Sequence, residues 1–132
     1  MRFSIKNYIL AVSQVLQNNQ QWRNDYNSRT TTHENQEAES RARHEGEICA
    51  MEDLLKVLPG LKTKLDVQEV LFAEIANIKT RNPSFTTNTG WAQVDGRGIE
   101  KNKEYGKWSR MQLLVDVDSM VRFYTPPKSS TP

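Results

Sequence analysis

The strongest chemical signal in the sequence lies between positions 79 and 110, where basic and aromatic side chains are interleaved. This segment carries seven basic residues against three acidic ones. Cations neutralise nucleic-acid phosphates, and flat rings stack on unpaired bases with about 1–3 kcal/mol per base. We therefore predict a binding surface for a nucleic acid or another partner. Its residues are Arg81, Trp91, Arg97, Lys101, Lys103, Tyr105, Lys107, Trp108 and Arg110.

The same residues have a second interpretation, in which the rings serve the fold. Trp91, Tyr105 and Trp108 would then be buried to anchor a segment with few other apolar residues, and the lysines would only keep the surface hydrated. Exposure of the rings beside Lys101 and Lys107 would indicate a binding surface, whereas burial would indicate a structural role.

Two groups of residues have spacings that could be compatible with metal binding. His33, Glu37 and His44 return to nearly the same face of a helix. However, eleven residues at about 1.5 Å rise separate the two imidazoles by about 16 Å along the axis, which is too far for one ion. Asp116 and Asp118 would share one face of a strand, as metal-dependent nucleotidyl transfer requires, but would diverge on a helix. We predict no metal site.

We find no nucleophile paired with a base in the sequence. The single cysteine, Cys49, stands among apolar residues of a predicted helix, where it serves as a small apolar side chain. The Gly-Arg-Gly at 96–98 matches half of a phosphate-binding loop, without the strand before it and the helix after it that such a loop needs. We therefore predict a protein that is not an enzyme, with no catalytic residues and no cofactor.

Three amphipathic helices are predicted to position these residues from the N-terminal side. Apolar residues recur at helical spacing over about 3–23. A second helix begins with the capping box at 31–34 and ends before Pro59, and a third begins with the capping box at 66–69 and ends before Pro83. The connections are short, so we expect these three helices to pack as an antiparallel bundle.

The first half of the second helix is unusual because its only apolar residues are alanines. Ala38, Ala42 and Gly46 follow one another at a spacing of four, so they lie on one face. Small residues let another helix approach closely, and we predict that these three contact a partner helix. The alternative is a segment that is partly disordered.

The C-terminal half is less regular. Four glycines and several Thr and Asn residues over 84–107 predict an irregular or β-hairpin insertion. For 113–124 we favour a helix, although apolar and polar residues also alternate as in a strand. The predicted fold is mainly α, a small helical bundle of three to four helices, and the alternative is α+β with 113–124 as a strand. We predict a single domain over 1–125 and a flexible tail over 126–132.

The composition limits the number of domains, the size of the core and the cellular compartment that we can predict for this protein. The 132 residues fit one domain, and 36% hydrophobic residues leave a thin core. One cysteine cannot form an internal disulfide, and no apolar run is long enough to cross a membrane. We predict a cytoplasmic protein without membrane contact that acts as an adaptor or inhibitor by binding a protein partner or a second copy of itself. The alternative is an accessory protein that binds DNA or RNA through 79–110.

Overall fold

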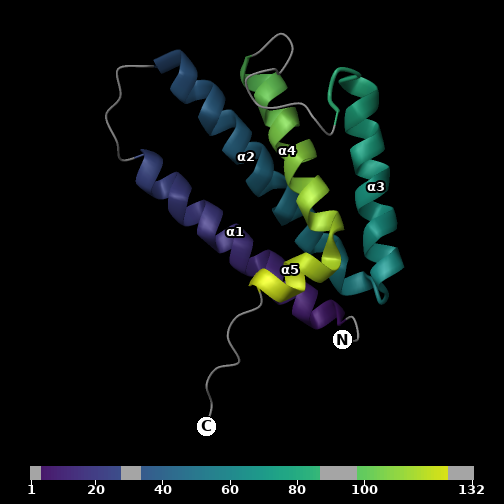
Figure 1. Cartoon of the computed structure of the whole chain (residues 1–132). Coiled ribbons are helices and arrows are strands. Elements are labelled where there is room, and N and C mark those ends of the chain that lie inside the picture. The colour runs from purple at the N-terminus through teal and green to yellow at the C-terminus, as the bar shows by residue number, and fades with distance from the viewer. Residues whose placement is uncertain (1–3, 28–33, 87–97, 125–132) are drawn as a thin grey trace.

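The computed structural model describes residues 4–27, 34–86 and 98–124, and every regular element within these ranges is a helix. The fold is therefore mainly α and matches a small helical bundle (Figure 1). The elements are α1 (Ile5–Asn27), α2 (Glu34–Val57), the short 3-10 helix η1 (Leu58–Gly60), α3 (Lys64–Arg81), α4 (Ile99–Val115) and α5 (Val117–Tyr124).

Helices α2 and α4 form the central pair and run in the same direction (Figure 1). Two contacts fix that direction: Asn102 donates to Glu39 near the start of both helices, and Arg110 pairs with Glu47 farther along both. Helix α1 packs against α2 and α5, and α3 packs against α4. The predicted antiparallel bundle of the first three helices is therefore wrong in one respect, because α3 packs mainly on α4 and not on α2.

The core is one cluster to which all five helices contribute. The apolar stripes that predicted helices also supply the buried faces, because side chains at spacings of three and four lie together on one face. Full burial of one such side chain contributes about 1.5–3 kcal/mol. Large members of the core with almost no exposed surface are Tyr8, Val12, Ile48, Met51, Leu71, Ile78, Phe85, Leu114 and Met120.

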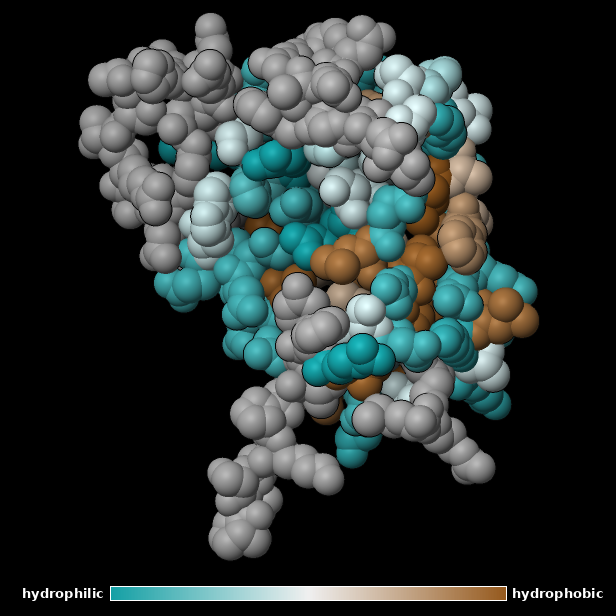
Figure 2. Space-filling model, viewed as in Figure 1, coloured by the Kyte–Doolittle hydropathy of each residue, from teal (hydrophilic) through white to brown (hydrophobic). Residues whose placement is uncertain are grey.

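Apolar residues also reach the surface of this small protein. On the side shown in Figure 2 they gather between α4 and α3 and along α3. The large hydrophobic residues with the greatest exposure are Leu10, Val57, Leu65, Phe72, Ile99 and Leu113. None of the described helices has both the length and the apolar content needed to cross a membrane.

Helix α3 begins with a capping box, three residues before the predicted one. The Thr63 hydroxyl accepts from the Asp66 backbone N–H (3.0 Å), and the Asp66 carboxylate accepts from the backbone N–H of Thr63 (3.1 Å). These bonds satisfy donors that a helix start leaves unpaired. Hydrogen bonds from the backbone of Thr63 and Lys62 lower the pKa of Asp66. The prediction correctly placed an Asp in the box, but as its first residue instead of its last.

The C-terminal region corrects two expectations. Helix α4 begins at Ile99, so the irregular insertion predicted over 84–107 cannot extend past 98, and its centre at 87–97 lies outside the described residues. The strand alternative for 113–124 is wrong, because these residues belong to α4 and α5. The break between the two helices falls at Asp116, whose carboxylate accepts from the backbone N–H of Ser119 (3.3 Å) at the start of α5. The predicted tail at 126–132 also lies outside the described residues.

Tyr8 joins the first helix to the end of α4, and its replacement by phenylalanine should measure that link. The buried hydroxyl of Tyr8 donates to the backbone carbonyl of Leu114 (2.7 Å), and burial raises the pKa of Tyr8. Tyr8→Phe would leave this carbonyl unsatisfied, so we expect a loss of about 1–2 kcal/mol in the free energy of unfolding, measured by urea denaturation. Lys6→Gln, on the exposed side of α1, is the control, and equal stability of the two variants would refute the link.

Candidate functional site

The small-residue stripe on α2 does contact a helix, and that helix is α4 of the same chain. Ala42 and Gly46 are buried, whereas Ala38 is half-buried. A Cβ atom at Gly46 would lie 2.1 Å from the Lys103 carbonyl oxygen, and one at Gly106 would lie 1.9 Å from the Arg43 carbonyl oxygen. Each glycine therefore meets the backbone of the other helix directly. The close approach at Gly46 is used within the fold, and Ala42 is buried, so these two residues are not open to a separate partner.

The aromatic residues of the predicted binding surface are part of the core. Tyr105 and Trp108 are only 8% and 5% exposed. The ring centroid of Phe85 lies 5.6 Å from each of theirs, with the Tyr105 ring nearly perpendicular to it. Rings that pack on one another in this way cannot stack on bases, so the expectation that Tyr105 and Trp108 line a binding surface is wrong. Trp91 and Arg97 lie outside the described residues.

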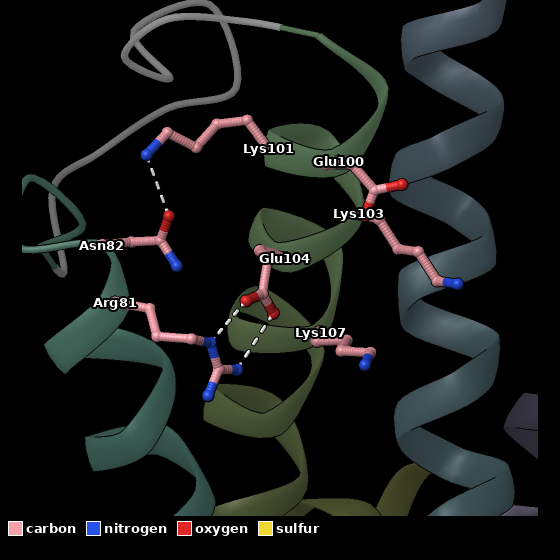
Figure 3. A pocket seen from close by; sticks show the side chains of 7 residues that line it. All are labelled: Arg81, Asn82, Glu100, Lys101, Lys103, Glu104 and Lys107. Carbon is pink, nitrogen blue, oxygen red and sulfur yellow. Dashed lines mark hydrogen bonds and ion pairs between the residues drawn. The ribbon is translucent and has the colours of Figure 1, made fainter.

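Four of the predicted basic residues nevertheless line one open hollow, which we call the cationic cleft (Figure 3). It has a volume of about 550 Å³ and lies between the end of α3 and the first half of α4. Successive turns of α4 bring Lys103, Glu104 and Lys107 to one side, while Lys101 reaches towards Asn82. Its lining residues are Arg81, Asn82, Glu100, Lys101, Lys103, Glu104 and Lys107.

Two polar links hold the cationic cleft together. Arg81 donates to both carboxylate oxygens of Glu104, at 2.7 and 3.2 Å, and this pair joins α3 to α4 (Figure 3). The hydrogen bonds from Arg81 lower the pKa of Glu104, and the same bonds raise the pKa of Arg81. Lys101 donates to the side-chain oxygen of Asn82 at 2.9 Å. Arg81 and Lys101 are therefore held at the cleft by neighbouring residues.

Lys103 and Lys107 differ from these two cations. Neither has an ion pair or side-chain hydrogen bond within the part of the chain that the structure describes. The cleft has four basic and two acidic lining residues, so its lining carries a formal charge of +2. An anion at this place would meet lysines whose ammonium groups are available to donate hydrogen bonds.

A second hollow, the apolar cleft, lies between α2 and α3 with α4 as its base. Its volume is about 420 Å³. Lys107 lines both hollows, so the two clefts share one continuous face along α4. The lining residues of the apolar cleft are Ala50, Asp53, Leu54, Val57, Val70, Leu71, Ala73, Glu74, Lys107 and Met111.

Sequence reasoning missed the apolar cleft, although a signal for it exists. The apolar residues of α3 include Val67, Leu71 and Ile78 on the buried face, but also Val70 and Ala73 beside it. An apolar surface wider than one stripe indicates either a second contact or a groove.

Arg110, the last predicted basic residue, lies elsewhere. Its guanidinium pairs with Glu47 on α2 (3.4 Å), and Glu47 also lies 3.3 Å from the His44 ring. The Trp22 ring of α1 stacks on His44 with centroids 3.8 Å apart. These four residues join α1, α2 and α4, so Arg110 serves the fold and does not line either cleft.

Glu47 lies at the centre of this cluster, and its titration should affect stability. Burial alone would raise the pKa of Glu47, but the hydrogen bond from His44 and the charges of Arg110 and His44 outweigh burial and lower it. A lowered pKa in the folded state means that the ionised carboxylate stabilises the protein above its ordinary pKa of about 4.3. That stabilisation is lost as the pH falls through the lowered pKa.

We expect Glu47→Gln to lower the free energy of unfolding by about 1–3 kcal/mol at pH 7. The difference from the wild type should shrink as the pH falls below about 4.3, because the unfolded chain then takes up a proton at Glu47 and the folded carboxylate does so only at its lower pKa. Urea denaturation at each pH measures both values. Glu52→Gln, on the exposed side of α2, is the control. A difference that does not shrink as the pH falls below about 4.3 would contradict this account of Glu47.

The acidic residues considered for metal chemistry have other roles. Asp118 pairs with Lys64 of α3 at 2.8 Å, and Asp116 caps α5. The described residues contain no group of three or more His, Cys, Asp or Glu side chains that could hold a metal ion. His33 and the side chain of Glu37 lie outside the described part of the chain.

Comparison with protein-family models, with curated proteins and with solved structures gives no match for this chain. A proposal about function therefore rests on the geometry of the two clefts along α4.

Proposed function

We propose that this protein is a small cytoplasmic interaction protein, without enzymatic activity, that binds an amphipathic helix of a partner protein in the apolar cleft. Binding of this kind would let it act as an adaptor or as an inhibitor. The observation that carries the proposal is the open apolar cleft between α2 and α3.

The shape and lining of the apolar cleft support a helical occupant. Two helices form its walls, and a third forms its base, which is the usual form of a groove that accepts an amphipathic helix. Val57 at the rim is 43% exposed, so apolar surface is available to a partner. A partner helix with anchors at i, i+4 and i+7 would cover this surface, and removal of apolar area from water would drive the association.

The test uses a labelled helical peptide of about 16 residues with leucines at i, i+4, i+7 and i+11, titrated into isotope-labelled protein. We expect saturable binding with a Kd on the order of 10–100 µM, and backbone amide shifts that centre on Val57, Val70 and Ala73. Fluorescence anisotropy gives the affinity, and the amide shifts give the location.

A matched pair of variants on α3 makes this test specific. Ala73→Arg places a long charged side chain in the apolar cleft and should weaken binding at least tenfold. Ala76→Arg changes an exposed alanine of the same helix that does not line the cleft, and should leave the affinity unchanged. The proposal fails if the peptide does not bind at about 1 mM, or if both variants bind as the wild type does. Dimerisation that Ala73→Arg abolishes would assign the cleft to a second copy.

Nucleic-acid binding is the second candidate function, and the cationic cleft favours it. Phosphate contacts through Lys101, Lys103 and Lys107 would make the affinity fall steeply with salt. Changing all three lysines to glutamate should then abolish a mobility shift seen with DNA or RNA at about 50 mM salt. Absence of any shift by the wild-type protein under this condition would exclude this candidate.

A further inference from the structure

The structure points to a specific partner chemistry, and this inference rests on the function proposed above. We infer that the cationic cleft binds the acidic end of the same partner helix whose apolar face occupies the apolar cleft. The partner segment would therefore have leucine-like anchors at one end and a cluster of Asp or Glu at the other.

The position of the two clefts on α4 supports a single occupant. Lys101 lines the cationic cleft, Met111 lines the apolar cleft, and Lys107 lines both. Ten residues at about 1.5 Å per residue place Lys101 and Met111 about 15 Å apart along the axis. Three turns of a partner helix span that distance, so one segment of ordinary length reaches both clefts.

The charges along this face differ between its two ends. Lys103 and Lys107 at the cationic end form no ion pair among the described residues, although the charge of Lys107 acts on Glu104, while Asp53 lines the apolar cleft. Carboxylates at one end of a partner helix would pair with the two lysines and also with the exposed side of Arg81. The same carboxylates placed at the other end would face Asp53, so the charge pattern favours one orientation.

An acidic peptide fits the cationic cleft better than a nucleic acid does. The rings of Tyr105 and Trp108, which could have stacked on bases, are buried. The apolar cleft that continues from Lys107 provides no contact that a sugar-phosphate backbone can use. A short row of spaced carboxylates next to apolar anchors satisfies both clefts.

The experiment compares three probe peptides that share the same leucine anchors and differ only in one end, which carries four Glu, four Gln or four Lys. At about 50 mM salt we expect the Glu peptide to bind about tenfold more tightly than the Gln peptide, and the Lys peptide to bind most weakly. At about 500 mM salt the difference should fall to about two- to threefold, because salt screens exposed charges.

Two variants that replace a lysine by glutamate test the role of Lys103, one at the cationic cleft and one away from it. Lys103→Glu should weaken the Glu peptide about fivefold or more and strengthen the Lys peptide, which a merely structural role of Lys103 would not do. Lys6→Glu, an equal change on the exposed side of α1, should alter neither affinity. Anisotropy measures all affinities, and circular dichroism of each variant verifies that it is folded.

The outcomes distinguish this inference from the proposed function. If the three peptides bind equally tightly and Lys103→Glu has no effect, the inference is wrong while the apolar cleft remains a peptide site. If no peptide binds, the proposed function itself is wrong. If the peptides do not discriminate but a 20-nucleotide strand binds, and Lys103→Glu abolishes that binding, the cationic cleft is a nucleic-acid site and the inference is overturned.

Discussion

Replacement of Gly46 or Gly106 by alanine is expected to lower the free energy of unfolding by about 3 kcal/mol. Glycine to alanine inside a helix normally stabilises it by about 1 kcal/mol, because alanine has the higher helix propensity. Here the new methyl group would lie 2.1 Å (Gly46) or 1.9 Å (Gly106) from a backbone carbonyl oxygen of the facing helix. Real Cβ contacts are never this short, so α2 and α4 must move apart.

The separation of α2 and α4 would disturb more than the two glycines. These helices form the central pair, and α3 and α1 pack on either side of them. Overpacking a core usually costs about 1–3 kcal/mol, and a collision with a rigid backbone belongs at or above the upper end of that range. The loss therefore exceeds the gain in propensity, and the net sign is destabilising.

Urea denaturation followed by circular dichroism measures this effect, and Gly60→Ala is its control. No atom lies within 4 Å of a Cβ atom added at Gly60, so this variant should differ from the wild type by no more than about 0.5 kcal/mol. Stabilisation by Gly46→Ala or Gly106→Ala would show that the two helices do not approach as closely as described.

The same glycines explain where sequence reasoning succeeded and where it failed. Ala42 and Gly46 stand in a regular helical pattern, so a close helix contact could be predicted from spacing. Gly106 stands among Asn, Lys and Tyr residues and was interpreted as part of an irregular insertion, because glycine lowers helix propensity. Its role becomes visible only when α2 is placed against it. Tertiary packing overrides local propensity at this position.

The sequence predicts the charges of the candidate site, but neither the helix that carries them nor the apolar cleft. Lys101, Lys103 and Lys107 line one cleft because α4 begins at Ile99, whereas the sequence predicts an irregular or hairpin insertion over 84–107. The apolar cleft depends on how α3 sits relative to α2, and that arrangement follows from the packing of α3 on α4. The burial of Tyr105 and Trp108 was likewise undecided, since both interpretations of an aromatic residue beside lysines use the same sequence pattern.

Phe85→Ala should decide the role of this aromatic group, with an expected loss of about 3–5 kcal/mol in the free energy of unfolding. Phe85 follows the end of α3, has no exposed surface and packs against the rings of Tyr105 and Trp108. Its removal leaves a cavity beneath the cationic cleft. Lys101 would also lose a contact, since its ammonium lies 5.7 Å from the centre of the Phe85 ring.

Phe72→Ala is the matched control for this variant, because Phe72 is a phenylalanine of α3 that is 55% exposed. We expect it to change stability by no more than about 0.5 kcal/mol, measured by the same urea denaturation. If the rings near Phe85 served a ligand instead of the fold, Phe85→Ala would weaken binding and leave stability nearly unchanged. The structure predicts the opposite result, because loss of Phe85 removes core packing and so lowers stability. Lys103→Glu changes a residue at the surface, so it should change the affinity for an acidic probe. It should leave the free energy of unfolding within about 0.5 kcal/mol of the wild type.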